Sequence, residues 1–254
     1  MQNSVLIGLS RQVALGRQLD VIANNIANLN TGAFKSDSAL FEAYLSPTAQ
    51  ANGPSGQNNR LDFVRDRATW VDWHQGPLQQ TGNPLDVAIE GKGFFAVQTA
   101  NGERYTRNGS LQINAQGQLV TSAGDPVLGE NGPIVFQKTD RGVTISKDGT
   151  ISVRTAGSNQ EAARGHLRIV SFQNVNQLQK DGNSYYAAPK NVTPDPDKTS
   201  TIAQGALEKS NVSAVLEMTH MIQVTRSYTE TAAMIAKQSD LQSTAIDKLA
   251  AVPA

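Results

Sequence analysis

The densest group of residues that could do chemistry is the run Trp70-Val71-Asp72-Trp73-His74. Tryptophan faces beside carboxylates are typical of sites that stack sugar rings, and Asp62 and Asp66 lie just upstream. Two carboxylates at a suitable separation also hydrolyse glycosides. The alternative is that the tryptophans pack the segment onto a β domain while the acids lie in solvent. Because proximity in sequence does not set a carboxylate separation, this structural alternative is favoured.

The remaining reactive side chains match no catalytic pattern. His166 and His220 have no neighbouring Ser or Cys in a nucleophile setting. Gly91-Lys92-Gly93 lacks the rest of a phosphate-binding loop, which favours a plain turn. The acidic spacing of a calcium loop is missing around Asp140 and Asp148. We therefore expect a protein that is not an enzyme and that binds no cofactor and no metal.

The composition excludes further classes of function. The 254 residues include no cysteine, which excludes thiolate chemistry and Cys-based zinc sites, and the three histidines disfavour a His-based metal centre. The net charge is zero at a pI of about 6.8, so no nucleic-acid partner is expected. No run approaches 18 apolar residues, and the N-terminal residues lack the basic and apolar regions of a signal peptide. We expect no membrane span, no cleavable signal and no small-molecule substrate.

The N-terminal residues 1–31 have the pattern of an amphipathic helix. Apolar residues at alternating intervals of four and three form one stripe, made of Leu15, Leu19, Ile22, Ile26 and Leu29. A slightly rotated face continues upstream through Val5, Leu6, Leu9 and Val13. Gly32 is expected to mark the C-terminal cap.

The longest run without glycine or proline, residues 206–252, predicts a second helix of roughly 40 residues and about 60 Å. Ser210 or Asn211 can cap its start. Near-heptad spacing relates Met221, Val224, Tyr228, Ile235, Ala245 and Leu249, and the stripe is widened by Val215, Met218 and Ile222. A helix of this length needs a partner, and the N-terminal stripe is shorter. Much of the C-terminal stripe is therefore expected to face other molecules.

The middle of the chain has the pattern of short strands and tight turns. Apolar residues alternate with polar ones from Leu85 to Tyr186. Hairpins are predicted at Asn101-Gly102, Asn108-Gly109, Asn131-Gly132, Asp148-Gly149 and Asp181-Gly182. An exposed loop is predicted at residues 51–59, and Pro189 to Pro196 has the composition of a linker.

The expected fold class is therefore α+β, in which paired, coiled-coil-like N- and C-terminal helices bracket an inserted antiparallel all-β domain. Residues 1–35 and 205–254 would form the helical assembly domain. Residues 36–80 would form an extended connector. Residues 81–204 would form the antiparallel β domain, with a linker back to the C-terminal helix.

Asparagines gather at the end of the first helix. Asn24 and Asn28 are four residues apart on one face, with Asn25 beside them and Asn30 at the end. Buried amides in a helical interface can fix its register. A polar helix end in water explains the same residues equally well.

Three regions carry a family resemblance. Leu19–Thr31 resembles the N-terminal signature of the bacterial flagellar rod and hook proteins. Asn83–Phe95 resembles the core motif of that family, which continues through Tyr105–Ser110 and Gly117–Val120. Ser210–Tyr228 resembles its C-terminal helix. The three motifs occur in the family's order and cover both ends and the middle of the chain.

Within that family, Gly8–Gln12 and Arg17–Asp20 look most like the proximal-rod protein, because the distal-rod protein usually begins with alanine-threonine-glycine there. One departure is visible at the end of the first helix. The family usually has Thr-Gly-Phe-Lys, whereas this chain places Ala33 directly before Phe34. The turn after the first helix is therefore expected to differ.

The resemblance implies a non-enzymatic structural subunit of the flagellar basal-body rod, in its proximal part. Its partners would be copies of itself, the proximal and distal rod proteins and the flagellar export apparatus. It would reach the periplasmic rod by type III export, without a cleavable signal. The distal rod protein and an extracytoplasmic carbohydrate-binding domain are the alternatives. The expected assembly interface comprises Leu15, Leu19, Ile22, Asn24, Asn25, Ile26, Asn28, Leu29, Val215, Met218, Met221, Ile222, Val224, Tyr228, Ile235 and Leu249.

Overall fold

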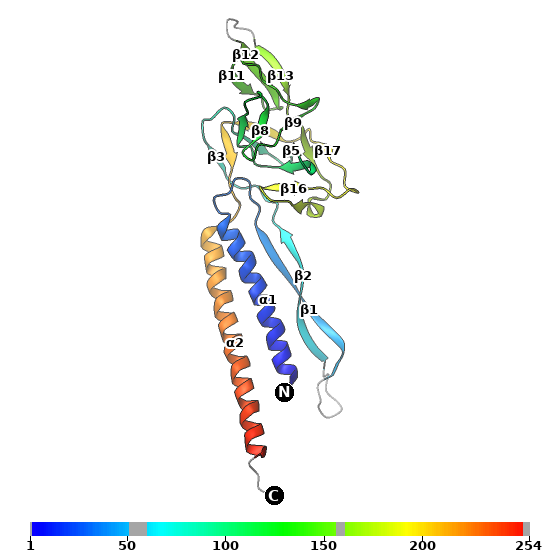
Figure 1. The fold of residues 1–254 in the computed structure, drawn as a ribbon, viewed down its shortest axis with the longest axis vertical. Coiled ribbons are helices and arrows are strands. Elements are labelled where there is room, and N and C mark those ends of the chain that lie inside the picture. The colour runs from blue at the N-terminus through cyan, green and yellow to red at the C-terminus, as the bar shows by residue number, and fades with distance from the viewer. Residues whose placement is uncertain (1, 51–59, 156–160, 251–254) are drawn as a thin grey trace. The chain divides into compact units, whose positions relative to one another are not determined.

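The protein is described by a computed structural model that covers residues 2–50, 60–155 and 161–250. The loop predicted at residues 51–59 lies outside these described residues. A helix at each end and antiparallel strands between them confirm the predicted α+β fold (Figure 1). The chain forms two compact units. The helical unit comprises residues 1–27, 37–72 and 213–254, and the β unit comprises residues 28–36 and 73–212.

The helical unit contains two helices and a ribbon of two strands. Helix α1 (Gln2–Ala27) and helix α2 (Ala214–Ala250) lie side by side and run in opposite directions. Strands β1 (Asp37–Gln50) and β2 (Arg60–Val71) pair antiparallel, and both contact α1. Most of the segment expected to be an extended connector is therefore a β ribbon.

Helix α1 is shorter than predicted, because it ends at Ala27, before the expected stop at Gly32. Helix α2 has 37 residues, close to the predicted length, and begins at Ala214, a few residues after the expected caps Ser210 and Asn211. The side chains expected to cap α2 have other partners: the Asn211 Oδ1 accepts a hydrogen bond from the Ser36 N–H, and the Ser210 Oγ accepts one from the Val212 N–H.

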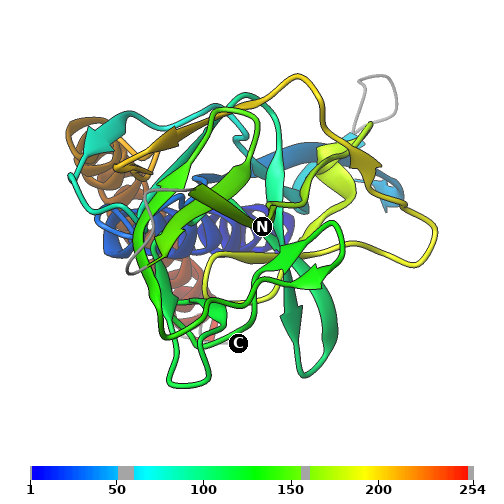
Figure 2. The ribbon, with the colours of Figure 1, turned by 90° about the horizontal axis from the view of Figure 1, so that it is seen from above.

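The β unit consists of short strands and one 3-10 turn. Its strands are β3 (Leu78–Gln80), β4 (Val87–Glu90), β5 (Phe94–Thr99), β6 (Gly102–Thr106), β7 (Leu111–Ile113), β8 (Leu119–Thr121), β9 (Leu128–Gly129), β10 (Gly132–Pro133), β11 (Asp140–Ile145), β12 (Thr150–Thr155), β13 (Glu161–His166), β14 (Ile169–Ser171), β15 (Gln179–Lys180), β16 (Tyr185–Ala187), β17 (Asp195–Pro196), β18 (Thr201–Gln204) and β19 (Ala206–Glu208), and the turn is η1 (Val175–Gln177). The largest sheet has the order β15-β16-β6-β5-β14-β17. Three strands form the sheet β11-β12-β13, and the remaining strands form the pairs β4-β18, β3-β19, β7-β8 and β9-β10. All pairs in the β unit are antiparallel, and Figure 2 shows that the strands point in several directions rather than forming one flat layer.

Four of the five predicted hairpins are confirmed. The turns at Asn101, Asn131, Asp148 and Asp181 each join two paired strands. The prediction at Asn108-Gly109 is wrong, because this turn joins β6 to β7, which lie in different sheets. A β-carbon at residue 109 would lie 1.7 Å from the Val87 carbonyl oxygen, so a close backbone approach accounts for the glycine.

The predicted linker at Pro189 to Pro196 is wrong for its last two residues. Asp195 and Pro196 form β17, which pairs with β14 at one edge of the large sheet. Proline is tolerated in such a strand because an edge strand leaves one row of its backbone groups unpaired. The return path toward the C-terminal helix is therefore part of the sheet.

Strand β5 lies between the two hydrophobic cores of the β unit. Its side chains alternate, so Phe95 and Val97 enter one core while Phe94 and Ala96 enter the other. The Tyr185 hydroxyl at the edge of the first core contacts Thr121 Oγ1 and donates to Asp125. Burial raises the pKa of Tyr185 to about 12, which keeps this hydroxyl protonated as a hydrogen-bond donor.

The departure from the family motif has a visible structural consequence at Ala33. This alanine is fully buried and has a φ of 55°, in the left-handed region that favours glycine. The family motif places glycine directly before the phenylalanine, at the position of Ala33 in this chain. Ala33 therefore adopts the backbone conformation for which a glycine would be suited.

We expect the free energy of unfolding of Ala33 variants to depend on backbone strain and on the space around the side chain. Ala33→Gly should stay within about 1 kcal/mol of the parent in free energy of unfolding, because relief of strain offsets the lost methyl group. Ala33→Val should cost at least about 2 kcal/mol, because a β-branched residue fits neither the left-handed φ nor the closed space. Urea unfolding of the two variants measures the difference, and equal stability would contradict the strained turn.

Candidate assembly interface

A heptad seam forms the interior of the helical unit. Buried and half-buried positions of α2 recur at intervals of three and four, at Ala214, Glu217, Met221, Val224, Tyr228, Thr231, Ile235, Gln238, Gln242 and Ala245. Such spacing keeps one face of a helix against a partner helix. On α1, Ala14 and Ile22 are buried. A β-carbon at Gly8 would lie 2.9 Å from Ile235 Cγ1, so the glycine permits the two helices to approach closely.

The structure divides the predicted interface residues into two groups. Those of the seam are buried or half-buried within the single chain: Leu15, Leu19, Ile22, Ile26, Met221, Val224, Tyr228 and Ile235. Val215, Met218 and Ile222 are exposed. Leu29 is half-buried and belongs to the β unit, and the side chain of Leu249 lies outside the described part of the chain.

The predicted asparagines have separate surroundings. Asn25 is buried, and its side chain binds one residue of β1 twice: Nδ2 donates to the Asp37 carbonyl oxygen at 2.8 Å, and Oδ1 accepts from the Asp37 N–H at 2.9 Å. Asn24 is exposed, and Asn28 accepts a hydrogen bond from the Thr31 hydroxyl. Asn25 therefore fixes α1 to the base of the ribbon.

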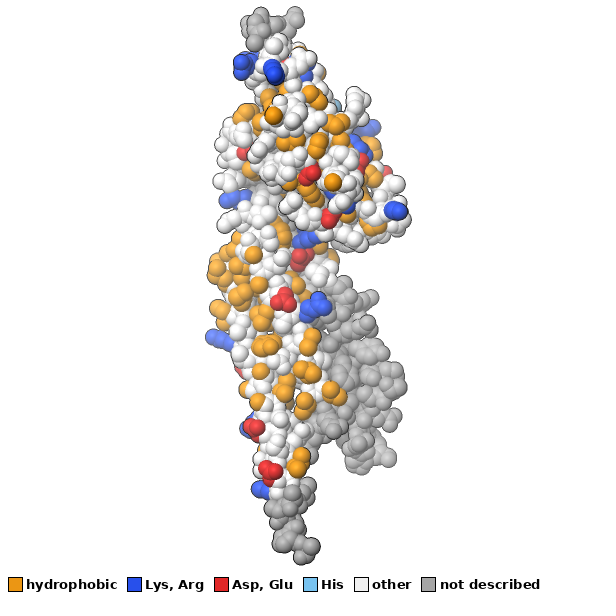
Figure 3. All heavy atoms as spheres, in the orientation of Figure 1, with side chains coloured by type: hydrophobic (Ala, Val, Ile, Leu, Met, Phe, Trp, Pro, Cys, Tyr) orange, Lys and Arg blue, Asp and Glu red, His pale blue; other side chains and the backbone are white. Residues whose placement is uncertain are grey.

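Apolar side chains remain exposed along the helical unit. They are Leu6, Leu9 and Val13 on α1 and Val215, Leu216, Met218, Ile222, Met234, Leu241 and Ile246 on α2. Val215 is 74% exposed, far from the burial expected of a core valine. Figure 3 shows hydrophobic side chains along the face in view. Exposed apolar surface of this extent is typical of an interaction site.

The exposed residues of α2 lie on both sides of its seam. At about 100° per residue, Val215, Met218 and Ile222 fall on one side. Leu216, Met234 and Leu241 fall on the other side. The near-heptad spacing alone does not indicate this second group, although a helical projection centred on the heptad positions shows it. Helix α2 thus has apolar surface for neighbours on two sides while α1 covers the seam.

The C-terminal end of α2 extends beyond α1. Gly8 approaches Ile235, and the two helices run in opposite directions. Six residues of α1 precede Gly8, whereas fifteen residues of α2 follow Ile235. The difference of about nine residues corresponds to about 13 Å of helix. Ile246 on this extension is 65% exposed.

The two tryptophans of the first candidate site belong to different units. Trp70 is exposed on β2 of the helical unit, whereas Trp73 lies in the β unit. The Trp73 ring lies 4.9 Å from that of Tyr186 and 5.8 Å from that of Phe94, and its Nε1 donates to Asn176. Trp73 is therefore part of the packing of the second core, which favours the structural alternative for this residue.

Among the described residues, the two remaining histidines have no catalytic partner arrangement, and Asp140 is paired with Arg164. The side chains of Asp62 and Asp66 lie outside the described part of the chain. His220 is exposed on α2, and His166 lies 3.6 Å from Glu130. Within residues 2–50, 60–155 and 161–250, no group of three or more His, Cys, Asp or Glu side chains could hold a metal ion. In the same part of the chain, no helix is both long and apolar enough to cross a membrane.

The chain thus has antiparallel terminal helices with exposed apolar faces and an inserted β unit. This arrangement is typical of a subunit that assembles with other subunits. Three family models match the chain in order. "Flagella basal body rod protein" matches residues 6–35, "Flagellar hook protein FlgE/F/G D1 domain" matches residues 88–153, and "Flagellar basal body rod FlgEFG protein C-terminal" matches residues 203–248.

Curated relatives extend this match to the whole chain. The flagellar basal-body rod protein FlgF of Caulobacter vibrioides is 38% identical over 98% of both chains, and that of Mesorhizobium japonicum is 34% identical over 98% of both. FlgG of Bacillus subtilis is 32% identical over 95% of this chain and 97% of its own. The chain belongs to the flagellar basal-body rod protein family, whose members are structural subunits of the rod.

Proposed function

We propose that this rod subunit lies in the proximal part of the rod and assembles through the exposed faces of α1 and α2. The observation that carries the proposal is the apolar surface on both sides of the α2 seam. A subunit surrounded by copies of itself and by other rod proteins would bury that surface. Contacts of this heterologous kind repeat from subunit to subunit and generate a helical filament.

Two observations support the proximal position over the distal one. The segment Gly8–Gln12 resembles the start of the proximal-rod protein. The two relatives named FlgF are 38% and 34% identical over 98% of the chain, whereas FlgG of Bacillus subtilis is 32% identical over 95% of it. Both support placing the protein in the FlgF branch of the family.

The same proposal includes the route to the rod and the absence of catalysis. The chain would pass unfolded through the flagellar type III export channel to the periplasm and fold where it assembles. Its role there would be mechanical, with no substrate and no cofactor. The packing of Trp73 between Tyr186 and Phe94 supports this role over carbohydrate binding.

Charges on the exposed face of α2 should block assembly without unfolding the subunit. We expect Met218→Asp with Ile222→Asp to change the free energy of unfolding of the isolated chain by less than about 1 kcal/mol, because both side chains are exposed. The same charges would lie in a desolvated contact in the rod, so the strain should not swim. Soft-agar motility and electron microscopy of purified basal bodies measure the effect.

The matched control places the same charges on exposed positions of α2 that lie opposite the seam, between the two apolar sides, as Thr219→Asp with Ala233→Asp, and this strain should swim. Normal motility of the Met218/Ile222 variant would refute assembly through this face.

The purified basal bodies also test the proposed position of the protein in the rod. Particles of the non-motile strain that retain a complete proximal rod and lack only the distal part would indicate the distal rod protein instead.

A further inference from the structure

The chain passes between its two units four times, after Ala27, Ser36, Asp72 and Val212. The residues of the β unit that adjoin these crossings are bound to one another by buried polar groups. We infer that Lys35, Arg107, Glu208 and Asn211 form an anchor that holds the crossings together in the free subunit, before any neighbour binds. The inference concerns the isolated chain and does not depend on the proposed place in the rod.

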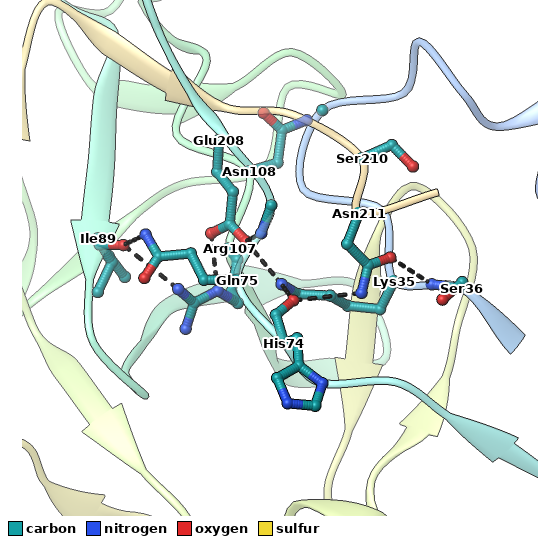
Figure 4. Close-up of polar contacts among 12 residues, drawn as sticks. Lys35, Ser36, His74, Gln75, Ile89, Arg107, Asn108, Glu208, Ser210 and Asn211 are labelled. Atoms are coloured by element: carbon teal, nitrogen blue, oxygen red, sulfur yellow. Dashed lines mark hydrogen bonds and ion pairs between the residues drawn. The ribbon is translucent and has the colours of Figure 1, made fainter. Parts of the chain in front are cut away.

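The centre of the anchor is a carboxylate shared by two cations (Figure 4). Glu208 Oε1 lies 2.6 Å from Lys35 Nζ, and Glu208 Oε2 lies 2.9 Å from Arg107 Nε. The Gly76 N–H also donates to Oε1, at 3.0 Å. The Lys35 and Glu208 side chains have no exposed surface, and that of Arg107 is 4% exposed. Charges this deeply buried are tolerated only when they are paired, so they strongly favour a single arrangement.

The side chains of Lys35 and Asn211 connect the crossing segments to one another. Lys35 Nζ donates to the His74 carbonyl oxygen at 2.6 Å, and Asn211 Nδ2 donates to the same oxygen at 3.2 Å. Asn211 Oδ1 accepts a hydrogen bond from the Ser36 N–H at 2.8 Å. These bonds connect the segment before β1, the segment after β2 and the segment before α2.

Backbone hydrogen bonds strengthen the same connections. The Ala33 N–H donates to the Glu208 carbonyl oxygen at 2.8 Å, and the Asn211 N–H donates to the Phe34 carbonyl oxygen at 3.3 Å. The Lys209 N–H donates to the Pro77 carbonyl oxygen at 3.0 Å. The three segments are therefore bound through main chain as well as side chains.

Arg107 attaches the anchor to the β core. Its Nη1 donates to the Gly93 carbonyl oxygen at 2.8 Å, and its Nη2 donates to the Ile89 carbonyl oxygen at 3.3 Å. Folding of the β unit therefore brings the segment that follows α1 next to the segment that precedes α2. Because the loop between the helices is then closed in advance, pairing of α1 with α2 costs less entropy.

A distance measurement on the isolated full-length chain tests the anchor. The chain has no cysteine, so Asn30→Cys with Lys209→Cys introduces two unique sites for nitroxide labels, both at exposed positions. Pulsed electron–electron double resonance should give one narrow distribution of the distance between the two nitroxide labels. Lys35→Met with Asn211→Ala should make that distribution at least about twofold broader. With Trp70→Phe in both proteins, the intrinsic fluorescence of Trp73 should report a folded β unit in each.

The control is Lys92→Met, which removes an exposed lysine of the same unit and should leave the distribution narrow. A distribution that stays as narrow as the parent's in the double variant would overturn the inference. If fluorescence shows that the double variant is unfolded, Asn211→Ala alone decides, because it leaves the ion pairs of Glu208 intact. In that variant a broader distribution supports the anchor, and an unchanged one overturns it.

Discussion

Replacing Glu208 with leucine should lower the free energy of unfolding of the β unit by about 3–5 kcal/mol. The loss arises because Lys35 and Arg107 remain buried after the carboxylate that they share is removed. The Gly76 N–H loses its acceptor as well. Urea unfolding followed by tryptophan fluorescence measures the change, with the slope of the transition as a check that the same unit unfolds.

A triple variant separates the buried charges from the packing. Lys35→Met, Arg107→Met and Glu208→Leu together remove all three charges while retaining most of the volume. Replacing a whole buried ion cluster by apolar groups is often nearly neutral, so a large part of the lost stability should return. A triple variant that is less stable than Glu208→Leu alone would contradict this expectation. It would show that the lost packing and the lost hydrogen bonds of Lys35 and Arg107 to the His74, Gly93 and Ile89 carbonyl oxygens outweigh the removal of unpaired charge.

Placing charges in the helix seam should abolish motility and open the helix pair. Ile22 is only 4% exposed and Ile26 is half-buried, so Ile22→Asp with Ile26→Asp forces carboxylates into the packed side of α1. We expect the α1 and α2 amides to lose protection from hydrogen exchange in the isolated chain, while the unfolding transition of the β unit stays unchanged. In a strain with this variant, the rod should stop at the position where this subunit would be added, and the strain should not swim.

The control shifts the same two charges by one residue, to Ala23→Asp with Ala27→Asp, where both positions are exposed. These charges keep the spacing of the first pair and should leave the amide protection of the isolated chain in place. A strain that builds flagella and swims with Ile22→Asp and Ile26→Asp would refute the role of the helix pair in assembly.

The sequence predicted the elements whose signals are local. The spacing of Met221, Val224 and Tyr228 indicated the seam of α2, and glycine turns such as Asn101-Gly102 indicated hairpins. Local signals failed where a distant partner decides the structure. Ala206–Glu208 has the composition of a helix, yet it pairs as β19 with β3, which is more than 100 residues earlier.

The anchor and the division of the interface had no local signal at all. Lys35 and Glu208 are 173 residues apart, and nothing near either residue indicates that they form a buried pair. The spacing on α2 predicted both Val224 and Ile222 as contact residues. Only the position of α1 shows that Val224 is covered within the chain and that Ile222 is exposed.

The extension of α2 past the N-terminal end of α1 makes the two ends of the helix pair unlike. At one end both helices continue into the β unit, and at the other end α2 projects alone with an exposed apolar residue, Ile246. In the proposed assembly, a neighbour would cover this projecting end with a different part of its own surface. Subunits joined in this way would all point in the same direction, which would give the growing structure a polarity and leave its two ends chemically distinct.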